Sequence, residues 1–171
     1  MANPMYGQNK LDNSIVRKLF SEAGTLREHE NTTDAADIFS YTIEPNLLAV
    51  GDIVRVKVFC TVVDSNSTDT LTPILNFGGT AIATGAALNV ADDDIVYAWA
   101  DVHVTAIGGS GTMTAISEIR TDANGGTSVT AATNLTSKDT TAGLDVALNV
   151  DWSVAHADNE VRIAAFSIEL I

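Results

Sequence analysis

The sequence predicts an all-β protein: an antiparallel β-sandwich, a jelly roll of about eight strands, preceded by an N-terminal arm. From residue 36 onwards, apolar and polar residues alternate with a period of two. This pattern is typical of strands with one buried and one solvent-facing side. Turn-forming clusters separate the alternating segments. The strands are long, and the single cysteine excludes the buried cysteine pair of an immunoglobulin domain, so a jelly roll is favoured.

The alternation is clearest in three segments, 52–63, 94–107 and 143–154. In the last of these, every second residue from Leu144 to Val154 is apolar, so that face is predicted to be buried. Weaker strand patterns cover 38–43, 71–77, 80–84, 112–121, 127–132 and 161–171. Within 161–171 the apolar face shifts by one residue, which predicts a β-bulge near Ala164-Ala165.

Residues 1–30 are predicted to form an arm, and residues 31–171 the sandwich domain. Within the arm, Asn13 or Ser14 can cap a helix and Gly24 can end it, which predicts a short amphipathic helix over about 14–23. Its apolar stripe contains Ile15, Val16, Leu19, Phe20 and Ala23. Such a short helix is marginal alone in water. It therefore needs a surface to cover its stripe: its own body, a sister subunit or another protein.

The charge of the chain is unevenly distributed. The net charge is −13, but residues 1–30 hold four basic and four acidic groups, which leaves 18 acids and 5 bases for residues 31–171. Nucleic acids and anionic membranes both require clustered Lys and Arg, so neither is expected as a partner. No apolar run approaches the roughly 20 residues of a membrane-spanning helix. The first ten residues lack the apolar centre of a signal peptide, so we expect synthesis in a host cytoplasm without the usual export.

Metal sites and catalytic cysteines are not predicted. Cys60 lies among apolar strand residues and is expected to be a small buried hydrophobe. His29, His103 and His156 are too far apart in the sequence for a typical zinc site, and solvated or interface positions are expected. The run Asp92-Asp93-Asp94 could hold calcium with help from elsewhere, but a hydrated acidic turn is the simpler interpretation.

Glycosidase chemistry requires two carboxylates that flank a cleft. Asp101, Asp145 and Asp151 are predicted on polar strand faces and could converge. Exposed aromatic residues near them are limited to Tyr97 and Trp99, because Trp152 shares the apolar face of its strand. Together with the absence of a Gly-x-Ser-x-Gly elbow or a phosphate-binding loop, this predicts a protein that is not an enzyme and has no cofactor.

The Thr/Ala/Gly-rich β body resembles small virion proteins of tailed bacteriophages. The resemblance rests on three short segments: Gly108-Gly109-Ser110-Gly111-Thr112, the ending Ala165-Phe166-Ser167-Ile168-Glu169-Leu170-Ile171, and the opening Met1-Ala2-Asn3-Pro4-Met5-Tyr6-Gly7-Gln8-Asn9-Lys10, which is similar to structural proteins of marine and cyanobacterial phages. The resemblance implies a jelly-roll decoration or cement protein that sits as a homotrimer on the capsid surface. A spike or collar component near the tail is the neighbouring possibility.

Two functional hypotheses follow. In the first, the chain cements a capsid by binding the major capsid protein or another virion protein through its arm. The apolar anchors are then Met5, Tyr6, Leu11, Ile15, Val16, Leu19 and Phe20. In the second, the sandwich is a receptor- or carbohydrate-binding module, in which Tyr97 and Trp99 stack on a sugar beside Asp101. A hydrolase is a third option without positive support.

Overall fold

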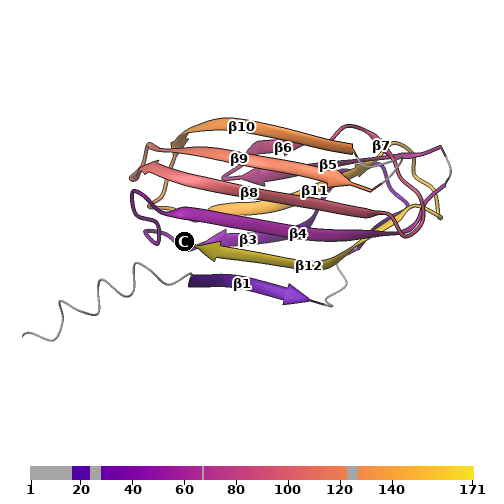
Figure 1. The fold of residues 1–171 in the computed structure, drawn as a ribbon, viewed down its shortest axis with the longest axis horizontal. Coiled ribbons are helices and arrows are strands. Elements are labelled where there is room, and N and C mark those ends of the chain that lie inside the picture. Colours follow the sequence, from indigo (N-terminus) through magenta and orange to yellow (C-terminus); the bar gives the residue numbers. More distant parts are fainter. Residues whose placement is uncertain (1–16, 24–27, 67, 123–126) are drawn as a thin grey trace, which may run out of the picture.

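The structure is a computed structural model, and it describes residues 17–23, 28–66, 68–122 and 127–171. All regular elements in these ranges are β-strands (Figure 1). The first six are β1 (Arg17–Ala23), β2 (Glu28–Glu30), β3 (Ala36–Ile43), β4 (Ile53–Asp64), β5 (Thr70–Phe77) and β6 (Thr80–Thr84). The others are β7 (Leu88–Asn89), β8 (Ile95–Ala106), β9 (Gly111–Thr121), β10 (Thr127–Lys138), β11 (Leu144–Trp152) and β12 (Glu160–Leu170).

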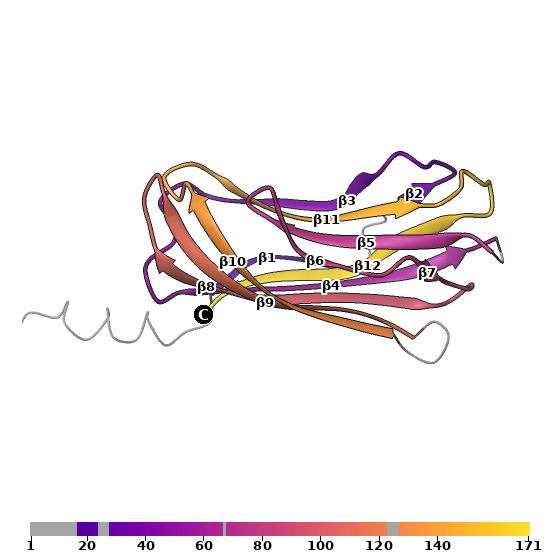
Figure 2. The same cartoon turned by 90° about the horizontal axis from the view of Figure 1, so that it is seen from above.

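The strands form two antiparallel sheets that face each other as two layers (Figure 2). Sheet A has the order β1-β12-β4-β8-β9-β10, and β2 also pairs with β12. Sheet B has the order β3-β11-β5-β6, and β7 also pairs with β5. If β1 with β2 is counted as the first strand, strands β1, β12, β4 and β8 oppose β3, β11, β5 and β6 in the interleaved order of a jelly roll. The hairpin β9–β10 extends sheet A beyond this eight-stranded frame.

The core lies between the sheets and consists mainly of aliphatic residues, together with Phe39, Phe77, Trp152 and Phe166. On β4, the side chains from Val54 to Val62 alternate between buried and accessible, and β8 does the same from Val96 to Val104. This confirms the period-two prediction. The prediction fails at Val154, which is 45% exposed because β11 ends at Trp152 and the chain turns there. The bulge predicted near Ala164-Ala165 is confirmed, since the pairing of β12 with β4 shifts between Ile163 and Ala165.

The helix predicted over about 14–23 is wrong for residues 17–23, which form strand β1. Residues 14–16 lie outside the described residues. Strand β1 pairs with β12 from Arg17 opposite Leu170 to Ala23 opposite Ala165, and β2 pairs with the other end of β12. Hydrogen bonding to a long neighbouring strand outweighs the weak local preference of a short helix. Both strands precede residue 31, so this part of the predicted arm is paired with sheet A.

The β8–β9 turn shows why its glycines are needed. Gly108 has a φ of +105°, which side-chain-bearing residues rarely adopt. A Cβ atom on Gly111 would lie 2.6 Å from the carbonyl oxygen of Lys138 and 2.8 Å from that of Ala106. The glycines therefore allow β9 to start directly against the end of β10.

Candidate functional site: the outer face of sheet A

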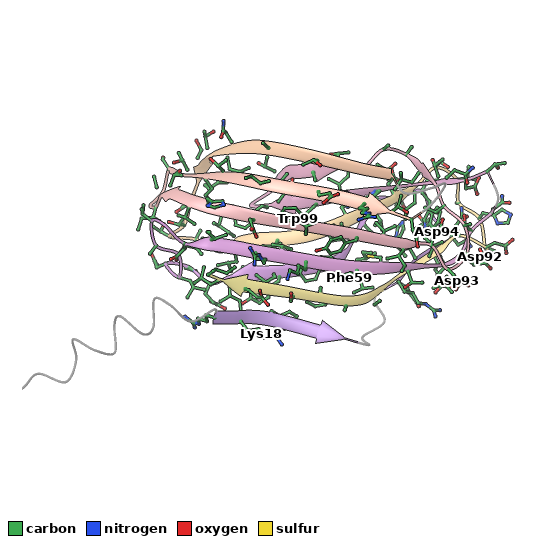
Figure 3. The ribbon with its side chains drawn as sticks, in the orientation of Figure 1. Lys18, Phe59, Asp92, Asp93, Asp94 and Trp99 are labelled. Atoms are coloured by element: carbon green, nitrogen blue, oxygen red, sulfur yellow. The ribbon has the colours of Figure 1, made fainter. Side chains whose placement is uncertain are left out.

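The outward side of sheet A carries a different set of side chains from the rest of the surface. We call it the sheet A face and define it by twelve accessible residues of β4, β8, β9 and β12. They are Arg55, Lys57, Phe59, Ile95, Tyr97, Trp99, Asp101, Ile116, Glu118, Arg120, Ser167 and Glu169. Figure 3 shows Phe59 and Trp99 on neighbouring strands near the middle of this face. The alternation of the four strands places all of these side chains on one side.

Aromatic and aliphatic side chains form the apolar part of the face. Phe59 and Tyr97 are directly opposite each other on β4 and β8, and their rings stack with centroids 4.5 Å apart. Phe59 is 42% exposed, Ile116 44% and Ile95 46%. Partial burial raises the pKa of Tyr97, and the negative charge of Glu118 adds to this shift. Large apolar side chains at such exposure are available for contact with a partner.

An ion pair crosses the same two strands. Arg55 donates from Nε and Nη2 to the two carboxylate oxygens of Asp101, both at 2.8 Å. This bidentate hydrogen bonding lowers the pKa of Asp101 and raises that of Arg55. The nearby charge of Lys57 also favours the ionised form of Asp101. Asp101 is thus a stable carboxylate whose hydrogen-bonding capacity is largely used within the face.

Trp99 has a polar partner on the next strand. Its indole Nε1 donates to Glu118 Oε2 at 2.8 Å, and the two residues are directly opposite on β8 and β9. Tryptophan at a surface usually keeps its N–H bonded while the ring offers apolar area. The indole ring therefore lies half-buried on the face, with its N–H bonded to Glu118 of the same face.

The outer side of sheet B is a contrasting surface. All residues of its five strands are described, and none is Lys or Arg. Its accessible positions hold the carboxylates of Asp37, Asp145 and Asp151, the aliphatic Ile74, and Ser, Thr and Asn residues. Thr42 donates to Asp145 at 2.5 Å. Of its aromatic residues, Phe39, Phe77 and Trp152 are buried in the core, and Tyr41 is partly buried with its ring stacked on Phe20.

The structure separates the carboxylates that a glycosidase would need to bring together. Asp101 lies on the outer side of sheet A, whereas Asp145 and Asp151 lie on the outer side of sheet B. The two sheets and the core stand between them. The possibility that these three residues converge is therefore wrong, because period-two strands in opposite layers point their polar sides away from each other.

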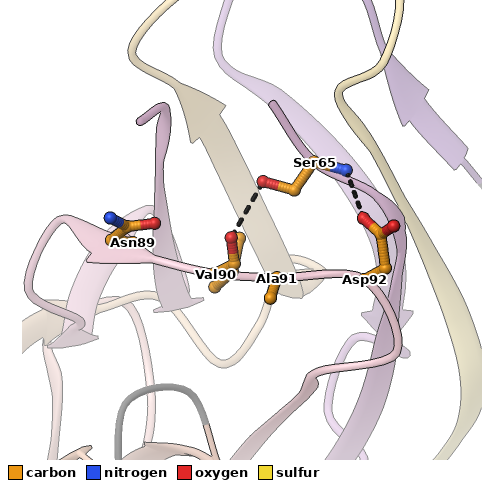
Figure 4. Close-up of a pocket in the computed structure, with 5 residues that line it drawn as sticks. All are labelled: Ser65, Asn89, Val90, Ala91 and Asp92. Atoms are coloured by element: carbon orange, nitrogen blue, oxygen red, sulfur yellow. Dashed lines mark hydrogen bonds between the residues drawn. The ribbon is translucent and has the colours of Figure 1, made fainter. Parts of the chain in front are cut away.

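The acidic run Asp92-Asp93-Asp94 lies in the turn before β8, at one end of the sandwich (Figure 3). Asp92 Oδ1 accepts from the Ser65 amide at 2.9 Å, and Asp94 Oδ2 accepts from the Ala91 amide at 2.7 Å. These bonds shape a shallow hollow of about 340 Å³ that Ser65, Asn89, Val90, Ala91 and Asp92 line (Figure 4). Within the described ranges, no group of three His, Cys, Asp or Glu side chains is placed to hold a metal ion.

The three histidines lie in different parts of the structure. His103 is exposed on β8 and His156 is partly exposed in the turn before β12, as expected. For His29 the expected accessible position is wrong: it is 5% exposed on β2, and its backbone oxygen lies 3.5 Å from Trp152 Nε1. Its Nε2 is buried, and no described residue bonds it. Burial lowers the pKa of His29, against the opposing charges of Asp151 and Asp34.

Cys60 and two of the arm residues lie against the core. Cys60 is buried, and loss of solvation raises the pKa of its thiol to about 12, which confirms the structural role predicted for it. Leu19 and Phe20 are partly buried and pack on the core of their own sandwich. The Phe20 ring lies 5.2 Å from the rings of Tyr41 and Phe166. The other predicted anchors, Met5, Tyr6, Leu11, Ile15 and Val16, lie outside the described residues.

Sequence reasoning identified Tyr97, Trp99 and Asp101 as members of one polar strand side, and the structure places all three there. It missed Arg55, Phe59 and Glu118 as their partners. The sequence indicates only which residues of each strand point outwards. It does not indicate which strands are neighbours, because the register between them joins residues 19 to 46 positions apart in the chain.

Comparison with known proteins adds a loose likeness in fold. No protein-family model and no curated protein matches the chain. The solved EclA C-terminal domain, a sugar-binding protein, shares 14% identity over 88% of this chain and 82% of that one, with a TM-score of 0.39. A structure of infectious bursal disease virus, Gt strain, shares 11% identity over 92% of this chain and 33% of that one, with a TM-score of 0.40. Likeness at this level carries no conclusion about partners. Among the described residues, no helix has the length and apolarity to cross a membrane.

Proposed function

We propose that this chain is a non-enzymatic structural protein of a bacteriophage virion, which decorates and cements the capsid. The observation that carries the proposal is the unequal division of its surface: one outer face combines aromatic, aliphatic and charge-balanced side chains, while the opposite face is acidic. A protein that acts by contact needs such a distinct interaction surface. The jelly-roll strand order is compatible with this role, because the fold recurs in viral capsid proteins, although fold alone does not assign function.

The attachment to the particle is proposed to involve the first sixteen residues. Leu19 and Phe20 are not among the proposed anchors, because they pack on the core of their own sandwich. Met5, Tyr6, Leu11, Ile15 and Val16 remain the proposed anchors. They precede β1, the edge strand of sheet A. A major capsid protein, or another virion protein, is the proposed partner.

The test is the location of the protein in intact particles. Immunogold labelling with an antibody against the sandwich is expected to mark the capsid in electron micrographs. A chain that lacks residues 1–16 should fold and no longer bind particles from which the wild-type protein is absent. Labelling confined to the tail would favour a spike or collar component, and no labelling of particles would contradict the proposal.

A second candidate function is carbohydrate binding at the sheet A face, which the shared position of Tyr97, Trp99 and Asp101 favours. Aromatic rings can stack on sugars while neighbouring polar groups bond the hydroxyls. A glycan array would detect such binding, and Trp99→Ala should abolish it. Thr72→Ala on sheet B, at a similar accessible position, is the matched control. An array without hits would contradict this candidate.

A further inference from the structure

Four polar side chains near the middle of the sheet A face are already paired within the face. Arg55 and Asp101 share two hydrogen bonds, and Trp99 is bonded to Glu118. Covering an unpaired charge is costly, whereas a hydrogen-bonded pair can be covered at a smaller cost. A sugar would have to compete with these internal bonds for the same oxygens and nitrogens. A flat protein surface would not, so the pairing favours a protein as the occupant.

The charges of the face favour a second copy of this chain. The face holds three cations, Arg55, Lys57 and Arg120, and three carboxylates, Asp101, Glu118 and Glu169. Of the other described cations after residue 30, Arg162 on β12 is paired with Glu28 and Glu160, and Lys138 is buried. Two copies with a net charge of −13 would repel least through their balanced faces.

The register of β4 and β8 makes the face complementary to itself. Arg55 is opposite Asp101, Lys57 opposite Trp99 and Phe59 opposite Tyr97. In a dimer whose two-fold axis is parallel to these strands and passes between β4 and β8, β4 of one copy lies over β8 of the other. Residues that are opposite each other within one sheet then lie at the same position along the strands in the two copies. Arg55 would then face the second copy's Asp101, and Lys57 the second copy's Trp99. Phe59 would face the second copy's Tyr97, so each contact would be made twice.

The size of the face fits a stable dimer. Strands of 12 residues such as β4 and β8 are about 40 Å long, and four neighbouring strands are about 19 Å wide. Their product is roughly 750 Å² for each copy, close to the roughly 800 Å² that each partner buries in a standard interface. The exposed Phe59, Ile95 and Ile116 provide apolar area within it.

We propose that two copies of this chain associate face to face through the sheet A face, with Arg55, Lys57 and Phe59 of each copy over β8 of the other. This inference rests on the proposed function, in which this face is a contact surface. It adds that a second copy of the chain is the partner that binds there. The resulting dimer has a mass of about 36 kDa, twice the 18.0 kDa of the chain.

The test measures mass by sedimentation equilibrium for the full chain, from about 1 µM to about 1 mM. We expect the wild type to reach about 36 kDa. Phe59→Glu should weaken association at least tenfold. Ile74→Glu, on the outer side of sheet B, adds the same charge and should leave the dimer intact. A wild-type monomer throughout, a mass near 54 kDa, or equal effects of the two variants would overturn the proposal.

A substitute variant and a fluorescence measurement extend this test. If Phe59→Glu does not fold by circular dichroism, Ile95→Glu at the exposed start of β8 replaces it. In the wild type, acrylamide quenching of Trp99 should decrease as concentration rises, and unchanged quenching would contradict the dimer. A wild-type chain that is monomeric yet labels capsids would overturn this inference and leave the proposed function standing. A dimer that labels no particle would support this inference and contradict the proposed function.

Discussion

The two outer faces of the sandwich are built from strands of similar period, yet they differ in what they can contact. The sheet A face combines a ring stack, an ion pair and exposed aliphatic residues. The outer side of sheet B presents Asp37, Asp145 and Asp151 among small polar residues. The first face can be covered by another protein, whereas the second favours solvent and repels acidic neighbours. One β-sandwich can therefore have one layer suited to contact with a protein and another suited to solvent.

The strongest test of this contrast is a charge reversal on each face. Asp101→Lys removes the bidentate partner of Arg55 and places a third cation beside Lys57, so we expect a loss of about 2 kcal/mol in the free energy of unfolding. Asp145→Lys loses only an exposed bond from Thr42 and relieves an acidic surface, so a change below about 0.5 kcal/mol is expected. Urea denaturation measures both. Equal losses would mean that the two faces are not different in their internal pairing.

A second test compares a buried with an exposed histidine. Burial lowers the pKa of His29 in the folded state, so between that value and the unfolded value near 6.5 the unfolded chain binds more protons. Stability should therefore fall as pH is lowered through this window, by at most about 1.4 kcal/mol per pH unit for one proton. Denaturation curves at a series of pH values measure this slope.

His29→Gln should flatten that slope, and His103→Gln on the exposed side of β8 should leave it unchanged. The charges that face His29 are those of Asp34 and Asp151. Both variants keep these two residues, so their contribution is the same in the two experiments. A slope that responds equally to both substitutions would contradict the assigned burial of His29.

A third test uses the two tryptophans, one on the sheet A face and one in the core. Trp99→Phe removes the hydrogen bond to Glu118 and should cost about 1 kcal/mol. It should also remove the emission that acrylamide quenches in dilute protein. The remaining Trp152 is 1% exposed and should stay shielded until the chain unfolds. Strong quenching in this variant would show that the core is open to solvent.

The smallest effect is expected on the outer side of sheet B. Thr42→Val removes a bond to Asp145 at an exposed position and introduces a residue with good strand preference, so stability should stay within about 0.5 kcal/mol of the wild type. Thermal unfolding measures it. A loss above about 1 kcal/mol would show that this face depends on its polar contacts more than the comparison allows.

The sequence predicts features that depend on the alternation of residues along one strand. It does not predict features that depend on pairing between strands that are distant in the chain. The buried run from Val54 to Val62 and the bulge at Ile163 and Ala165 were visible because alternation and its interruption are written along one strand. Strand β1 was predicted as a helix because Leu19 and Phe20 fit a helical stripe, and only the neighbouring β12 makes them a strand. The burial of His29 depends on the same neighbour, through β2.

The candidate site was predicted in part for the same reason. Tyr97, Trp99 and Asp101 share a strand, so their common side follows from the sequence. The choice of Arg55, Phe59 and Glu118 as their neighbours depends on which strands pair and in what register. No local pattern contains that information.

The pairing of Arg17 with Leu170 places the two ends of the described sandwich side by side. A short engineered linker could join them into a continuous chain, because neighbouring ends tolerate circular permutation. New ends opened at the exposed Gly79, in the β5–β6 turn, would move attached tags or enzymes away from β1. Such a permutant would present cargo from sheet B and leave the opposite layer unobstructed.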